Sequence, residues 1–149
     1  MAAETQSKVV PSISSGTAGP LGALHLPRMW LKISLASVDA LPEGYDECGA
    51  GFDAMTLNAL GLDRQKTIDF IRQNHPTYME FEEWVVANGK TDKATIDRHN
   101  AAIAGYNHGD ALAQQMRDSS KIKDSSIKDA VSLNTIEDLD EIHRQHLRK

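Results

Sequence analysis

The sequence predicts an all-α fold, a compact small bundle of six or seven short helices preceded by a flexible N-terminal tail. Three observations lead to this prediction. Hydrophobic residues recur with a helical period after about residue 24, almost no segment alternates as a strand would, and Asp, Thr, Pro and Gly stand where helices begin and end. At 149 residues the chain is long enough to bury one core.

Composition excludes several classes of partner. The chain is 40% hydrophobic and 25% charged, with a net charge of −5 and a pI of about 5.6. A nucleic-acid binder or a protein drawn to an anionic membrane needs a basic face, so we expect neither partner. No apolar run approaches the roughly 18 residues of a membrane helix, and the first residues lack a secretory signal. We therefore expect a soluble, cytoplasmic protein. Its single cysteine can form no intrachain disulfide.

The chain divides into three predicted parts. Residues 1–23 are rich in Ser, Gly, Pro and Ala and read as a flexible tail, which could still pack on the body through Val9, Val10 and Ile13. Residues 24–117 form the helical core domain. Residues 118–149 form a charged linker followed by a terminal helix that packs on the core.

The first predicted helix begins near Pro27, because a proline in the first turn costs no hydrogen bond. Leu31, Leu35 and Val38 follow on one face at helical spacing, and Pro42 ends the segment.

Capping residues predict the next three helices. Asp53 caps a short second helix, which Gly61 ends in a left-handed conformation. Asp63 caps a third helix. Thr77 and Glu80 form a capping box at the start of the fourth, which is the clearest element in the chain.

Capping residues also predict helices in the C-terminal half. Thr91 is the predicted cap of a fifth helix, and Asp110 that of a short sixth. Residues 118–129 form a charged near-repeat, which we interpret as a linker. Residues 130–134 are predicted to form a short extended piece. Thr135 then caps a terminal helix.

The stretch "EGYDECGAGFD", residues 43–53, is the first candidate for a site because it contains four carboxylates, a tyrosine and the only cysteine. It does not fit a calcium loop: counting from Asp46, the residues Cys48, Ala50 and Leu57 occupy ligand positions. Its Gly-Ala-Gly triplet lacks the strand and third glycine of a phosphate-binding loop.

The stretch "LHLPR" at the start of the first helix is the second candidate. A cation in a first turn opposes the helix dipole, so Arg28 should have an acidic partner, and Asp46 or Asp53 is the expected one. A functional alternative keeps this geometry and adds a ligand. Arg28 then binds an anion, Tyr45 or His25 transfers a proton, and Asp46 orients that group.

Other chemistry-bearing residues have structural interpretations beside functional ones. Cys48 is either a small, partly buried residue or a nucleophile, and its acidic neighbours disfavour the thiolate. Trp84 is most simply a core residue with its N–H bonded to Asn100, and alternatively contacts a substrate. His143 and His146 lie at the charged chain end and read as a solvated helix tail, so we expect no metal and no cofactor.

Several of these motifs occur in an order that resembles a bacterial family known only as a domain of unknown function. They are "HLPR" (25–28), "GYDECGAGFD" (44–53), "LGL" (60–62), "MEFEEWV" (79–85) and Asn100. The resemblance covers about residues 22–106. It implies a small stand-alone domain, brings no activity with it, and directs attention to residues also singled out above: His25, Arg28, Tyr45, Cys48 and Asp53.

These residues support one hypothesis and two alternatives. The hypothesis is a metal-independent small-molecule enzyme of the acid/base lyase, isomerase or hydrolase type. The alternatives are a ligand-binding domain with the same pocket, or a protein-interaction module using exposed helix faces or the 118–129 segment. The oligomeric state stays open. A cleft with converging polar groups favours the first two, and an exposed apolar patch the third. The candidate catalytic residues are His25, Tyr45 and Asp46, and the candidate substrate-binding residues are Arg28, Cys48, Asp53 and Trp84.

Overall fold

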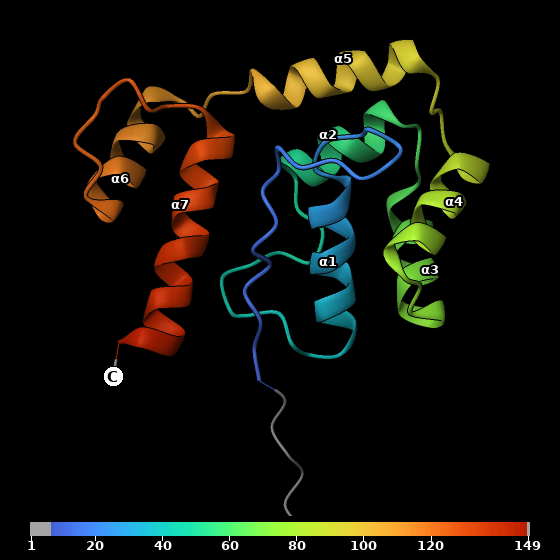
Figure 1. Ribbon diagram of the computed structural model, residues 1–149, viewed down its shortest axis with the longest axis horizontal. Coiled ribbons are helices and arrows are strands. Elements are labelled where there is room, and N and C mark those ends of the chain that lie inside the picture. Colours follow the sequence, from blue (N-terminus) through green and yellow to red (C-terminus); the bar gives the residue numbers. More distant parts are fainter. Residues whose placement is uncertain (1–6, 149) are drawn as a thin grey trace, which may run out of the picture.

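A computed structural model describes residues 7–148 and confirms the all-α prediction (Figure 1). Within this range the only β-type pairing is an isolated bridge between Asn107 and Asp129. The helices are α1 (Leu26–Ser37), α2 (Phe52–Ala59), α3 (Arg64–Asn74), α4 (Tyr78–Asn88), α5 (Lys93–Ala104), α6 (Asp110–Ser120) and α7 (Ala130–Ile142), and α7 runs on into a π-helical turn, His143–Leu147.

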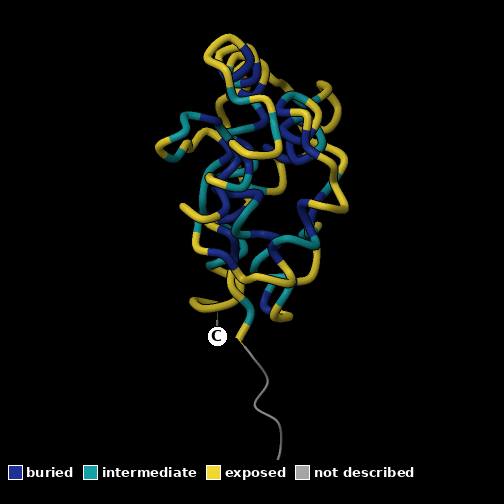
Figure 2. Tube along the Cα trace, turned by 90° about the vertical axis from the view of Figure 1, so that its right-hand side faces the viewer, coloured by how far each residue is buried: buried dark blue, intermediate teal, exposed yellow. Residues whose placement is uncertain are grey.

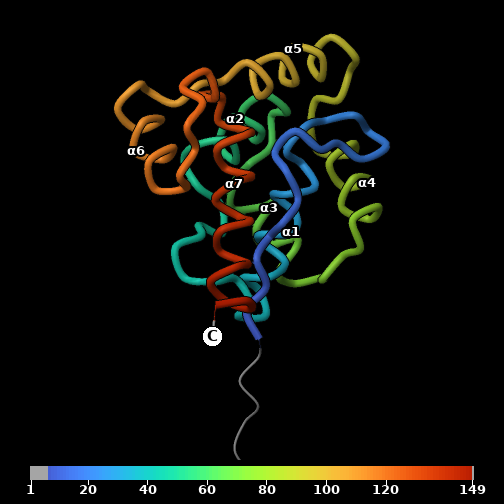
Figure 3. Tube along the Cα trace, turned by 60° about the vertical axis from the view of Figure 1, so that its left-hand side comes forward, coloured from blue at the N-terminus to red at the C-terminus, as the bar shows by residue number. Residues whose placement is uncertain are grey.

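Helix α1 lies at the centre of the bundle. It packs against α3 and α4 on one side, α2 packs against α5, and α6 pairs with α7 on the other side of α1 (Figures 1 and 3). The core forms around Leu26, Met29 and Ile33, which recur at helical spacing on α1 and are fully buried. The predicted face of this helix is therefore wrong: Leu31 and Leu35 are only half-buried, and Val38 is exposed. They meet buried residues of α3 and α4, including Ile71 and Phe81. Exposed positions gather at the periphery (Figure 2).

The local start and stop signals are confirmed for the middle of the chain. The side chain of Asp63 accepts a hydrogen bond from the backbone N–H of Lys66. Thr77 and Glu80 form the reciprocal capping box at the start of α4. Gly61 follows α2 with φ of 65°, in the left-handed region that glycine enters without strain.

Two predicted caps are wrong by one residue. The N-cap of α5 is Asp92 and not Thr91, because the Asp92 carboxylate accepts from both the backbone and the hydroxyl of Thr95. The N-cap of α6 is Gly109, and Asp110 lies in the first turn.

The start of the terminal helix is wrong by a larger margin. Helix α7 begins at Ala130, where the Asp129 carboxylate caps the backbone N–H of Ser132. The predicted extended piece at 130–134 is therefore the first part of α7, and Thr135 lies inside the helix. Burial of Ala130 and Leu133 stabilises this early start.

The N-terminal segment is held against the body from residue 7 onward, in place of the loose tail expected for residues 1–23; residues 1–6 lie outside the described part. The backbone N–H of Val9 donates to Ala40, 2.7 Å away, and Val10 and Pro11 are buried. The segment passes between α1 and α7 (Figures 1 and 3). Its apolar residues and its carbonyl groups have partners in this position. Those partners are distant in the sequence, so local sequence patterns do not reveal them.

Candidate functional site

Helix α1 carries three polar residues on one face. His25 stands at its N-cap, and Arg28 and Lys32 follow at spacings of three and four residues. Their exposed fractions are 2%, 8% and 8%. Buried polar and charged side chains need partners, so neighbouring segments must supply hydrogen-bond acceptors to these three residues.

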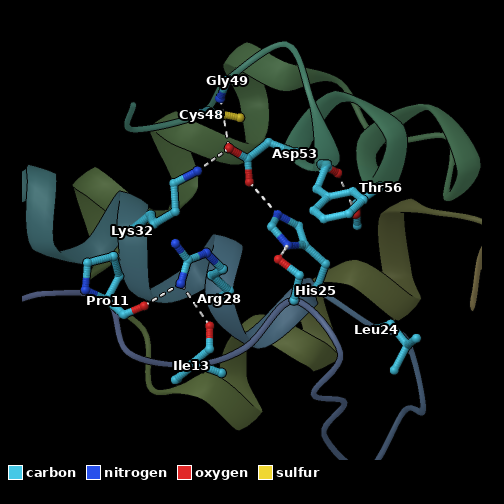
Figure 4. Close-up of polar contacts among 12 residues, drawn as sticks. Pro11, Ile13, Leu24, His25, Arg28, Lys32, Cys48, Gly49, Asp53 and Thr56 are labelled. Carbon is cyan, nitrogen blue, oxygen red and sulfur yellow. Dashed lines mark hydrogen bonds and ion pairs between the residues drawn. The ribbon is translucent and has the colours of Figure 1, made fainter. Parts of the chain in front are cut away.

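Asp53 is the partner that joins two of these residues (Figure 4). One carboxylate oxygen lies 2.6 Å from His25 Nε2, and the other accepts from the backbone N–H of Gly49 at 2.7 Å and from the Lys32 ammonium. Burial alone would raise the pKa of this carboxyl, but the His25 hydrogen bond and the Lys32 charge outweigh it and hold the pKa at about 2. Asp53 is thus charged, and its carboxylate oxygens already have hydrogen-bond partners. The predicted N-cap of α2 at Asp53 is wrong: the N-cap is Gly51, and Asp53 lies in the first turn.

His25 completes a buried relay with Ser15. Burial lowers the pKa of the imidazole despite the neighbouring Asp53, so the ring is neutral near pH 7. A charged carboxylate can only accept, so Nε2–H donates to Asp53 and Nδ1 accepts from the Ser15 hydroxyl, 2.9 Å away. The order Ser–His–Asp has the connectivity of a hydrolytic triad, but all three residues are only 2% exposed. A substrate has no access to this hydroxyl, so we assign these hydrogen bonds a structural role.

Arg28 pairs with a residue of the terminal helix, and the predicted pairing with Asp46 or Asp53 is wrong. Its guanidinium binds both oxygens of Asp138, at 2.6 and 3.1 Å, and also donates to the carbonyl groups of Pro11 and Ile13. Lys32, one turn further along α1, takes Asp53 instead. Arg28 is left to hold α7 and the N-terminal segment against α1.

Tyr45 joins the same ion pair. Its hydroxyl donates to Asp138 at 2.9 Å. Burial and the Asp138 carboxylate raise the pKa of Tyr45 well above its ordinary value. Asp46 was expected to orient this group, and Asp138 does so in its place.

A cleft of about 400 Å³ opens beside this ion pair, between α1, residues 43–46 and α7. Two carboxylates on its walls have ion pairs, Asp138 with Arg28 and Glu141 with Arg144. Partial desolvation and the neighbouring Asp138 raise the pKa of Glu137. The lining includes five carboxylates, Glu43, Asp46, Glu137, Asp138 and Glu141, and three cations, Arg28, Lys32 and Arg144, together with Gly44, Tyr45 and Asn134.

The remainder of the 43–53 loop is bound to α3. Arg72 forms an ion pair with Glu47 at 2.6 Å, and Arg64 donates to the carbonyl of Cys48 at 3.0 Å. Cys48 is buried, and this burial together with Asp53 raises the pKa of its thiol to about 11. The thiolate is therefore disfavoured, and the thiol is absent from the lining of the cleft.

Trp84 lies in an aromatic stack on α4, with its ring centroid 4.9 Å from that of Phe70 and 6.2 Å from that of Phe81. The predicted bond to Asn100 is wrong, since the Asn100 amide accepts from Leu24 N–H and donates to Gly22 O. The cleft lining does not include Trp84. Its packing supports a core role.

The structure thus separates the candidate residues into three groups. Arg28, Tyr45 and Asp46 line the cleft, whereas His25, Cys48 and Asp53 are buried and absent from its lining, as is Trp84. Sequence reasoning missed Lys32 and the residues of α7. The i, i+3, i+7 spacing of His25, Arg28 and Lys32 was an available signal. No comparable signal marks Asn134, Glu137 and Asp138.

A scan against protein-family models and a search of the curated proteins give no match for this chain. Each described helix is too short or too polar to cross a bilayer. In residues 7–148, no group of three or more His, Cys, Asp or Glu side chains is arranged to hold a metal ion.

Proposed function

We propose that the protein is a non-catalytic domain that binds a small molecule in the cleft between α1, residues 43–46 and α7. One observation carries the proposal: polar side chains from three segments far apart in the sequence line one opening of about 400 Å³. That volume lies in the range of small-ligand sites. Arg28, Tyr45 and Asp46, all singled out from the sequence, are among the lining residues.

The charges of the lining favour a ligand with a positively charged group, such as an amine or a guanidine. No ion pair occurs among the described residues for Glu43, Asp46 or Glu137, whereas each cation of the lining has a carboxylate partner. An ammonium about 4 Å from a carboxylate gains about 1 kcal/mol in bulk water, and more where water is partly excluded. Arg28 is neutralised by Asp138, so we assign it to the wall of the site and not to the binding of an anion.

The buried groups argue against the catalytic alternative. His25 cannot exchange a proton with a ligand in the cleft, because its ring is 97% buried and both nitrogens have partners. Tyr45 lines the cleft, but its raised pKa keeps the proton on the hydroxyl near neutral pH. Binding without chemistry is therefore the function that the geometry supports best.

The proposal is tested by following backbone amide signals in an NMR titration. Spermidine and arginine amide serve as cationic probes, and succinate serves as the anionic control. We expect the cations to shift the amides of Gly44, Tyr45 and Asn134, and succinate to leave them unchanged.

Two variants locate the binding. Glu137→Gln and Asp46→Asn remove a negative charge from the lining and should each weaken binding several-fold. Glu83→Gln removes one from an exposed position on α4, outside the lining, and should not. The proposal fails if no cation moves the cleft amides, or if all three variants bind as the parent protein does.

A further inference from the structure

An apolar groove of about 360 Å³ lies between α7 and the loop at 121–129. It shares no lining residue with the polar cleft. Its apolar members are half-buried, as expected for side chains that pack on one side and meet solvent on the other. The groove is lined by Ile122, Ile127, Val131, Ser132, Thr135 and Ile136.

Leu139 stands on the same face of α7. At 100° per residue, Ser132, Thr135, Ile136 and Leu139 share one side of the helix, whereas Asn134 and Asp138 point to the cleft side. Leu139 is 55% exposed, and one turn separates it from Ile136. The same face thus carries a hollow at one end and a protruding leucine at the other.

We infer that this face binds a second copy of the chain, with the two α7 helices antiparallel. A two-fold axis near Thr135 brings Leu139 of each copy to Val131 and Ser132 of the other. Each leucine then enters the partner's groove, which is the self-complementary arrangement that a two-fold interface requires. A parallel arrangement would leave both leucines outside the grooves.

The charges beside these two features are complementary. The loop at 121–129 carries three lysines and two aspartates, a net charge of +1. Of the four carboxylates at 137–141, Glu137, Asp138 and Glu141 line the polar cleft, which leaves the negative charge of Asp140 beside Leu139. Antiparallel pairing places the lysine-bearing loop of one copy beside Asp140 of the other, so salt should weaken the dimer.

One helix face and one loop from each copy would form the contact, so we expect a small interface and a dimer that dissociates on dilution. Sedimentation equilibrium of the full chain, up to about 0.5 mM, should show a mass rising above the 16.4 kDa of one chain. Leu139→Asp should weaken the dimer about tenfold or more. Leu112→Asp is the matched control, since Leu112 is 47% exposed on α6 and does not line the groove.

Cysteine cross-linking tests the orientation, and a mixed pair keeps one Leu139 side chain in its partner's groove. A mixture of Ser132→Cys and Leu139→Cys should form a disulfide-linked pair under mild oxidation, whereas each variant alone should not. Native Cys48 is buried, and the parent protein measures its background. A mass of one chain at the highest concentration would overturn the inference, as would cross-linking of the mixture no greater than that of the single variants. Neither result bears on the cleft.

Discussion

Asp53→Asn is the substitution that most directly tests the buried cluster. The change keeps the shape of the side chain and removes its charge. The side chain of Lys32 is only 10% exposed, so its ammonium would lose its counter-ion in a place that water scarcely reaches. The amide has one acceptor oxygen, so either His25 or the backbone N–H of Gly49 would face an NH₂ group that cannot accept.

Two estimates give the size of the effect. A carboxyl whose pKa is 3.8 when unfolded and about 2 when folded stabilises the protein by about 2.5 kcal/mol at neutral pH. Breaking a buried ion pair by removing one partner typically costs about 3–5 kcal/mol. We therefore expect Asp53→Asn to lower the free energy of unfolding by about 2–4 kcal/mol, a large part of the total for a small domain.

The contribution of Asp53 should also be visible in how the free energy of unfolding depends on pH. Because the folded pKa of Asp53 lies below the unfolded one, its contribution is complete above about pH 4 and is lost as the pH falls toward 2. Stability of the parent protein should decline in that window. In the Asp53→Asn variant the free energy of unfolding should decline less over this pH range, because the contribution of Asp53 is absent.

Urea unfolding followed by circular dichroism, at pH 7 and at steps down to about pH 2.5, measures both effects. Asp97→Asn is the control, because its pair with Lys93 is exposed on α5 and should contribute less than about 0.5 kcal/mol. Adding Lys32→Met to Asp53→Asn should restore stability, since the unpaired ammonium is then gone. A loss below about 1 kcal/mol for Asp53→Asn, or a double variant weaker than the single one, would refute the reasoning.

Four further predictions follow from the same contacts. Since burial lowers the pKa of His25 below 6.5, the parent protein should lose stability as pH falls through and below 6.5, and His25→Gln should reduce that slope in urea titrations. Tyr45→Phe removes one hydrogen bond to Asp138 and should cost about 1–2 kcal/mol in the same assay, with little change in secondary structure. Arg28→Met leaves Asp138 buried and unpaired, and should lower the unfolding free energy by about 3–5 kcal/mol; an unchanged urea midpoint would contradict the pairing. Cys48 should react with a thiol reagent at pH 8 far more slowly than the unfolded chain does, because its pKa is about 11; equal rates would show that the thiol is accessible.

The features that the sequence predicts correctly are local. The Asp63 N-cap, the capping box of α4 and the left-handed glycine after α2 depend on residues within about four positions of one another, and there the predictions hold. Predicted starts fail where two neighbouring residues compete for one N-cap, as Thr91 and Asp92 do, or where burial of a first turn extends the helix, as at Ala130.

The partners of the charged residues depend on tertiary packing. Arg28 and Asp138 are 110 positions apart, and the sequence offers several carboxylates nearer to Arg28. The choice depends on which helix lies beside α1 and on the N-terminal segment that runs between them, whose carbonyl groups share the guanidinium. The helix positions are set by burial of apolar faces, which is non-directional and summed over the whole bundle. A buried charge then takes the acceptor that this packing brings within reach, so the cleft and its lining follow from the packing and not from any local pattern.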